Sequence, residues 1–295
     1  MAEFRAHARN AVKVDTPDNK VRPDNLARRS PSAGRAPARP RYEAAPVALL
    51  LALSLLAWLA SGAFMNGEMR VGLLTRAEGE PDGMGSAGMA MTLPLFMASW
   101  VVMMIAMMFP AVSPMVLTFW RWANGRDDAG RRTASLVAGY LVVWSTIGFV
   151  AYAMLQLLEY RRAASTDGAV RFAAILVVAA GAYQLTPLKS VCLRHCRTPL
   201  SVLVEHAPLL SGGSVGAFRL GLKHGAFCVG CCWSLMLVLL LLGLMNLVWM
   251  GIVAAIIFSE KALPHGVLVS RVVSVSLIGV GVAGLVAPDA FSPIR

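Results

Sequence analysis

Residues 224–243 read HGAFCVGCCWSLMLVLLLLG, a stretch in which a group of cysteines leads directly into a long apolar run. Its first nine residues hold three of the chain's five cysteines and one of its five histidines. Successive residues of an α-helix are about 100° apart, so His224, Cys228 and Cys231 would share one stripe, with Cys232 beside it. Thiolate and imidazole groups suit Cu(I) or Zn(II). The stretch therefore predicts a buried helix that carries four candidate metal ligands.

These four residues also have a purely structural interpretation. Cysteine packs as a small apolar residue in membrane helices, and His224 would then serve only as a hydrogen-bonding residue. Two adjacent cysteines that follow another cysteine and a histidine are an unusual packing solution, however. Their spacing also fits no zinc-finger pattern of soluble proteins and no c-type haem pattern. We therefore favour a metal site over simple packing.

The composition indicates a membrane protein. Hydrophobic residues make up 57% of the 295 residues and charged residues only 15%, and several apolar runs are long enough to cross a bilayer. We expect an all-α, polytopic membrane protein with about seven transmembrane helices in a domain over residues 46–290. The expected spans are residues 46–65, 93–119, 134–158, 170–188, 218–243, 247–263 and 272–287.

The basic residues indicate how the chain crosses the membrane. A net charge of +11 would suggest nucleic acid in a soluble protein, but here it follows from basic segments between the spans. We therefore expect the lipid bilayer as a partner and no nucleic acid. With the N-terminus inside, the inner segments carry 19 Lys or Arg and the outer segments 6. Residues 1–45 are basic, rich in proline and without apolar periodicity, so we expect a disordered cytoplasmic tail.

A second pair of cysteines, Cys192 and Cys196, lies in the inner loop 189–197 that we expect after the fourth span. The fifth span starts on the same side, so its cysteines fall in the cytoplasmic half of the membrane. Thiols near the reducing cytoplasm serve more often as metal ligands or redox groups than as structural disulfides. We therefore interpret Cys192 and Cys196 as an exit or transfer pair, although this spacing also occurs in ordinary loops.

The second expected span is rich in methionine. Residues 97–115 contain six methionines, and Met104 and Met108 share one face of an ideal helix. Thioethers bind Cu(I) without adding charge, so both residues are candidates to guide or complete coordination, although methionine is also a flexible filler in helix packing. Pro110 and Pro114 free backbone carbonyls that must be satisfied by protein or water. We therefore expect this segment to line the interior of the helix bundle.

Charged residues mark the inner end of the sixth expected span. One interpretation is that Glu260 and Lys261 mark a functional site or form an internal ion pair. The alternative is that Lys261 reaches the lipid headgroups and Glu260 reaches water. Lys189, at the inner end of the fourth span, is interpreted as an interfacial anchor.

Several segments together resemble a family of bacterial integral membrane proteins that are predicted to bind metal. The shared segments are Trp100 with MIAMMFP at 104–110, YQLTPLKSVCL at 183–193, CRTP at 196–199, HGAFCVGCCW at 224–233, MNLVWM at 245–250 and Glu260-Lys261. The resemblance runs from the second span to the end of the sixth and leaves out the basic tail. It implies a location in the bacterial inner membrane and metal binding, without implying a reaction. His195 is not carried over as a ligand.

We expect a membrane protein that binds a soft transition metal, Cu(I) or alternatively Zn(II). Its function would be transport, or delivery to a membrane metalloenzyme or metal chaperone. The candidate metal ligands are His224, Cys228, Cys231, Cys232, Cys192, Cys196, Met104 and Met108, and no catalytic residue is predicted. Two other functions stay open: a membrane thiol–disulfide oxidoreductase that uses Cys228 and Cys231, and a non-catalytic assembly subunit whose cysteines only pack. The sequence contains no phosphate-binding loop of the form Gly-x-x-x-x-Gly-Lys-Ser/Thr, which argues against ATP-driven pumping by this chain alone.

Overall fold

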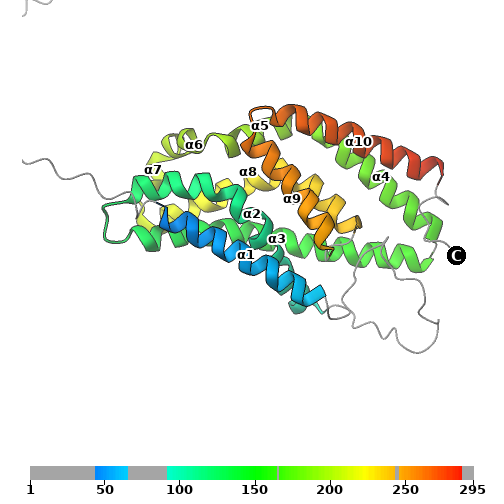
Figure 1. Ribbon diagram of the computed structural model, residues 1–295, viewed down its shortest axis with the longest axis horizontal. Coiled ribbons are helices and arrows are strands. Elements are labelled where there is room, and N and C mark those ends of the chain that lie inside the picture. The colour runs from blue at the N-terminus through cyan, green and yellow to red at the C-terminus, as the bar shows by residue number, and fades with distance from the viewer. Residues whose placement is uncertain (1–43, 66–91, 165, 243–245, 288–295) are drawn as a thin grey trace, which may run out of the picture. The chain divides into compact units, whose positions relative to one another are not determined.

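The computed structural model describes residues 44–287 except 66–91, 165 and 243–245, and all of these residues belong to one compact unit. Every regular element in these ranges is helical, as Figure 1 shows. The helices are α1 (Ala45–Met65), α2 (Leu93–Ala123), α3 (Ala129–Ala164), α4 (Thr166–Gln184), α5 (Pro187–Arg197), α6 (Pro199–Glu205), α7 (Ala207–Leu210), α8 (Gly213–Leu242), α9 (Leu247–Ala262) and α10 (Gly266–Val286). The basic tail predicted for residues 1–45 lies outside the described residues except for its last two.

Five of the described helices, α1, α2, α3, α8 and α10, are long and apolar enough to cross a membrane. Helices α4 and α5 would form a sixth span if taken together, but the chain bends by 63° between them. Helix α9 has 16 residues, fewer than the about 20 of an ordinary crossing. The described part therefore holds several long apolar helices, where the sequence predicts seven spans.

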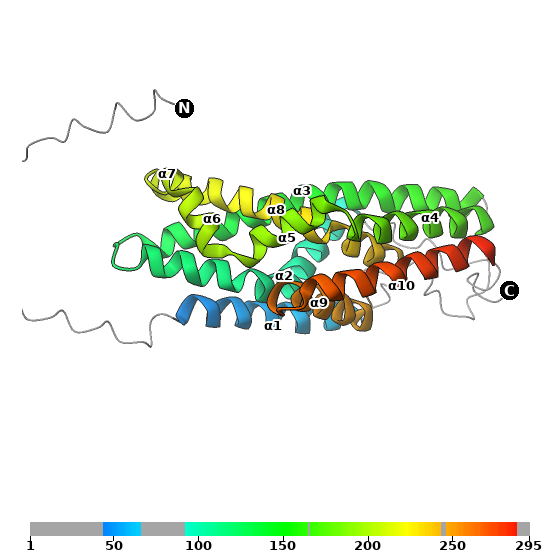
Figure 2. The same cartoon turned by 90° about the horizontal axis from the view of Figure 1, so that it is seen from above.

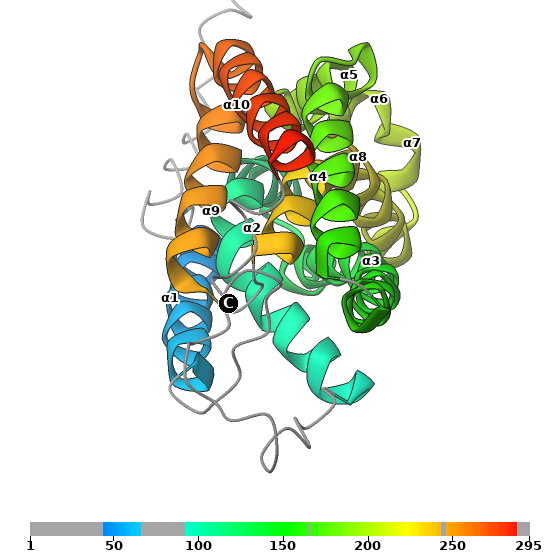
Figure 3. The same cartoon turned by 90° about the vertical axis from the view of Figure 1, so that its right-hand side faces the viewer.

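The helices pack mainly in pairs: α1 with α2, α3 with α8, and α4 with α10. Figures 2 and 3 show α4 and α10 side by side, as does Figure 1. Helix α5 lies against α8, and α9 contacts α2, α5, α8 and α10. Helix α8, the cysteine helix, is thus flanked by α3, α4, α5 and α9.

The contact between α3 and α8 depends on small residues. A Cβ atom on Gly139 would overlap the backbone carbonyl of Phe218, and one on Gly221 would overlap the carbonyl of Leu136. The two backbones are therefore closer than any larger side chain allows, which is a common way for membrane helices to pack. This close approach places Tyr140, next to Gly139, against the cysteine helix.

The methionine segment of α2 lies inside the bundle, as its prolines predict. Pro110 leaves the carbonyl of Ala106 without its helical partner, and α1 supplies replacements. Ser54 Oγ and Trp58 Nε1 donate to this oxygen at 2.7 and 3.1 Å. The carbonyl of Pro110, which Pro114 leaves free in turn, accepts from Ser113 Oγ at 2.8 Å.

Residues 189–197, expected to form a loop, are part of helix α5. Thr186 caps this helix, because its side chain accepts a hydrogen bond from the backbone N–H of Lys189, and Pro187 occupies the first turn. The helix is too short and too basic to register as an apolar run, which explains the wrong expectation. It lays Cys192 and Cys196 along α8 instead of in solvent.

Candidate metal centre

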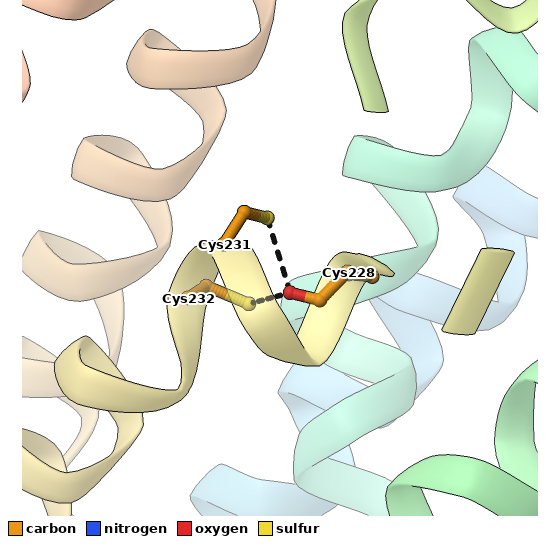
Figure 4. Close-up of side chains that lie close together, drawn as sticks. All are labelled: Cys228, Cys231 and Cys232. Carbon is orange, nitrogen blue, oxygen red and sulfur yellow. Dashed lines mark hydrogen bonds between the residues drawn. The ribbon is translucent and has the colours of Figure 1, made fainter. Parts of the chain in front are cut away.

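Three cysteines of α8 form a compact sulfur cluster. The Sγ atoms of Cys228, Cys231 and Cys232 all lie within 4.8 Å of one another, and all three side chains are buried. Figure 4 shows that the thiols of Cys231 and Cys232 point back to the carbonyl oxygen of Cys228, to which they donate at 3.0 and 2.9 Å. The spacing i, i+3 and i+4 brings the three thiols together, as a helix requires.

Three other helices contribute side chains to this cluster. From α3, the Tyr140 hydroxyl lies 3.1 Å from Cys228 Sγ. From α9, Lys261 Nζ donates to the same sulfur at 3.1 Å. From α5, Cys196 Sγ lies 3.7 Å from Cys231 Sγ. Sulfur atoms from two helices therefore converge at a point that four helices surround.

The fit between α5 and α8 is close at Gly230. A Cβ atom there would lie 2.6 Å from Cys192 Sγ, so only glycine leaves room for this thiol. The carbonyl of Gly230 also accepts a hydrogen bond of 2.5 Å from the Tyr183 hydroxyl, and the Tyr183 ring packs edge-on against Trp233 at 4.8 Å. Cys192 thus packs on the backbone of α8, beside the cluster, while Cys196 reaches into it.

His224 lies one turn before Cys228 but outside the group of mutually close sulfurs. Its side chain is buried, its ring centroid is 6.2 Å from that of Tyr140, and its Nδ1 has no hydrogen-bond partner within the described residues. His195 is not part of the cluster; its ring stacks on Phe227 at 4.1 Å.

Met104 and Met108 are completely buried in the same hydrophobic core as the cysteines. Within the described residues, no hydrogen bond of the cysteines involves either thioether. The principal neighbours of α2 are α1, α3 and α9. The structure therefore places the methionines inside the bundle, on a helix that packs mainly against other helices than α8.

A buried ion pair lies close to the cluster. Lys189 Nζ of α5 donates to both carboxylate oxygens of Glu260 at 2.7 and 2.9 Å, and both side chains are almost completely buried. The interpretation of Lys189 as an interfacial anchor was therefore wrong. Glu260 does form an internal pair, but with Lys189, 71 residues away in the sequence, and not with the adjacent Lys261.

Sequence analysis assigned no role to Tyr140. A tyrosine inside an apolar helix must find a partner for its hydroxyl, which signals an internal contact but does not identify the partner. The neighbouring residue, Gly139, was an additional signal in the sequence, because small residues are common where membrane helices pack closely, as Gly139 does against α8.

Comparison with known protein families gives one match. Residues 97–284 match the family PpoB2, which is described as a copper chaperone. The matched region includes the three cysteines of the sulfur cluster, Cys196, Lys189 and Glu260. No match was found to a curated protein or to a solved structure.

Proposed function

Because the chain belongs to the PpoB2 copper chaperone family, we propose that it binds Cu(I) within a membrane and delivers it to a membrane metalloenzyme. The observation that carries this proposal is the sulfur cluster: three thiols within 4.8 Å of one another and a fourth from another helix. Cysteine sulfur is a soft ligand that selects Cu(I) from the common metal ions, with Zn(II) as the main competitor. Copper is cargo in this account and not a resident cofactor.

We assign Cys228, Cys231 and Cys232 as the core of the site. Rotation of the thiols of Cys231 and Cys232 away from the carbonyl of Cys228 would free them to bind an ion. His224 is proposed as an additional ligand, because its buried Nδ1 has no hydrogen-bond partner within the described residues. Met104 and Met108 are proposed only as a path toward the site, since α2 packs mainly against α1, α3 and α9.

Transfer would proceed through Cys196. Its sulfur is close to that of Cys231 but belongs to a different helix. An ion can therefore pass from one thiolate to the other and stay bound to at least one sulfur atom throughout. Cys192 lies four residues earlier on α5 and would take the ion next. Stepwise exchange between thiolates avoids a free copper ion in the membrane interior, where an unpaired charge is costly.

The topology is also part of the proposal. Seven crossings with the N-terminus inside, in a bacterial inner membrane, would put the cluster in the cytoplasmic half, next to a reducing compartment. The distribution of Lys and Arg supports this orientation. Labelling of single cysteines introduced at exposed helix ends, with membrane-impermeant reagents applied to either side, tests it.

Elemental analysis of the detergent-purified full-length protein tests the function. We expect near-stoichiometric copper in the wild type and loss of most of it in Cys231→Ser, because the central thiol of the cluster is removed. Ser234→Ala is the matched control, since Ser234 is buried on the same helix and belongs to no sulfur contact. Equal copper in Cys231→Ser and the control would contradict the proposal.

One observation favours a second function, thiol–disulfide exchange. Cys196 and Cys231 are close enough to be joined by a small movement of α5, with two protons and two electrons passing to a disulfide of a partner protein, which is reduced to two thiols. Mass spectrometry after alkylation distinguishes the functions. A reversible Cys196–Cys231 disulfide in metal-free protein would support redox chemistry, whereas bound copper with reduced thiols supports the chaperone.

A further inference from the structure

Lys261 places a positive charge against the thiol cluster. Its Nζ donates to Cys228 Sγ at 3.1 Å, so an ammonium group touches one of the proposed metal ligands. Within the described residues, no carboxylate forms an ion pair with this lysine. The proposed role of the cysteines as metal ligands does not require this cation. A charged group that is withdrawn from water loses hydration free energy, so its place beside the thiols calls for an explanation.

The adjacent acid does not neutralise Lys261. Both oxygens of Glu260 are held by Lys189 Nζ, and the pair is buried between α5 and α9. Such a pair is neutral as a unit. The charge of Lys261 is therefore left to act on the thiols and on any ion that they bind.

A fixed positive charge beside a buried site distinguishes ions by their charge. Whatever the number of thiolates, the ammonium group repels a bound divalent ion twice as strongly as a monovalent ion at the same position. Coulomb's law with an effective dielectric constant of about 20 and a separation of about 5 Å makes binding of an ion with one additional positive charge about 300-fold less favourable. Relaxation and water reduce this factor, so a tenfold effect is a conservative expectation.

We propose that Lys261 is a specificity-determining residue that makes the sulfur cluster prefer a monovalent soft cation, Cu(I) or Ag(I), to divalent Zn(II). The inference rests on the proposed function, because it assumes that the cysteines bind metal. It adds a reason why thiols, which also bind Zn(II) well, would carry copper here.

Competition with chelators of known affinity measures Cu(I) and Zn(II) binding to the full-length protein in detergent. We expect Lys261→Met and Lys261→Gln each to lower the ratio of Cu(I) to Zn(II) affinity at least tenfold. The glutamine variant keeps a hydrogen-bond donor for Cys228 and removes only the charge. Lys261→Arg, which keeps the charge, should stay within about threefold of the wild-type ratio. Lys223→Met is the control for loss of an exposed positive charge on α8.

The outcomes separate this inference from the function on which it rests. Wild-type protein that binds neither ion would overturn both. Intact copper binding with an unchanged affinity ratio in Lys261→Gln, or an equal change in Lys223→Met, would overturn only the role of Lys261. If Lys261→Met does not fold, the glutamine and arginine variants still decide between charge and packing.

Discussion

Two sulfur-rich regions lie in the core of this protein, the cysteine segment of α8 and the methionine segment of α2, and their surroundings differ. Around Cys228, α3, α5 and α9 supply a hydroxyl, a thiol and an ammonium group. Met104 and Met108 are completely buried, and no hydrogen bond to either thioether is found within the described residues. The polar partners that reach α2 bind its backbone: Ser54 and Trp58 satisfy the carbonyl freed by a proline.

This difference gives a criterion that distinguishes residues of a functional site from residues that only pack in a membrane helix. Buried polar groups are costly unless each has a partner, so a convergence of them from several helices points to function. Buried methionine needs no such partner. By this criterion we propose the cysteine segment as the metal site and interpret the methionine segment as mainly structural.

The largest stability effect should come from the buried ion pair beside the cysteines. Removing one partner in Lys189→Met or Glu260→Gln leaves an unpaired buried group, which typically costs about 3–5 kcal/mol. The double variant Lys189→Leu with Glu260→Met should recover much of this loss, because no charge remains buried. Thermal unfolding in detergent measures both. Single variants as stable as the wild type would show that the pair is open to water.

Gly230→Ala should have an intermediate effect on the cysteine side. The new methyl group would meet Cys192 Sγ and push α5 away from α8, at a cost of about 1–3 kcal/mol. Copper affinity should fall as well, because the same movement withdraws Cys196 from Cys231. The alanine variant at Gly279, where a Cβ atom meets nothing within 4 Å, is the control. Unchanged copper affinity in Gly230→Ala would mean that α5 does not take part in binding.

On the methionine side, Ser54→Ala should cost about 1 kcal/mol, because it removes one hydrogen bond to a carbonyl that Trp58 still satisfies. Copper content should not change. Parallel thermal unfolding and elemental analysis check this. Loss of copper in this variant would indicate that α1 and α2 are coupled to the metal site.

Little effect on the copper site is expected for Met104→Leu with Met108→Leu. Leucine conserves volume, so each substitution should cost less than about 1.5 kcal/mol, and the copper stoichiometry should match the wild type. A fall in copper stoichiometry to the level of Cys231→Ser would reverse the comparison and make both thioethers ligands. A slower rate of copper loading at equal stoichiometry would fit a role as a path.

The apolar runs identified the long helices because a membrane span depends on local composition. The described part of the run at residues 218–243 lies within α8, and the run at 93–119 lies within α2. Helix α5 was missed because eleven residues with several cations do not form an apolar run. The Thr186-Pro187 start signal was present and could have identified it.

The sequence named Cys192 and Cys196 as candidates beyond the cysteine helix, but only the arrangement within that helix could be predicted from spacing. Helical spacing alone brings Cys228, Cys231 and Cys232 together, but it cannot tell which residues of other helices meet them. The contacts of Tyr140, Cys196 and Lys261 depend on tertiary packing, and so does the pairing of Lys189 with Glu260. A rule based on sequence neighbours would have paired Glu260 with the wrong lysine.

X-ray absorption at the copper edge of the purified, copper-loaded protein identifies the metal ligands. We expect a first shell dominated by sulfur, with Cu(I) edge features, that is lost in the double variant Cys228→Ser with Cys231→Ser. A shell of nitrogen and oxygen only, or an unchanged spectrum in that variant, would contradict this expectation.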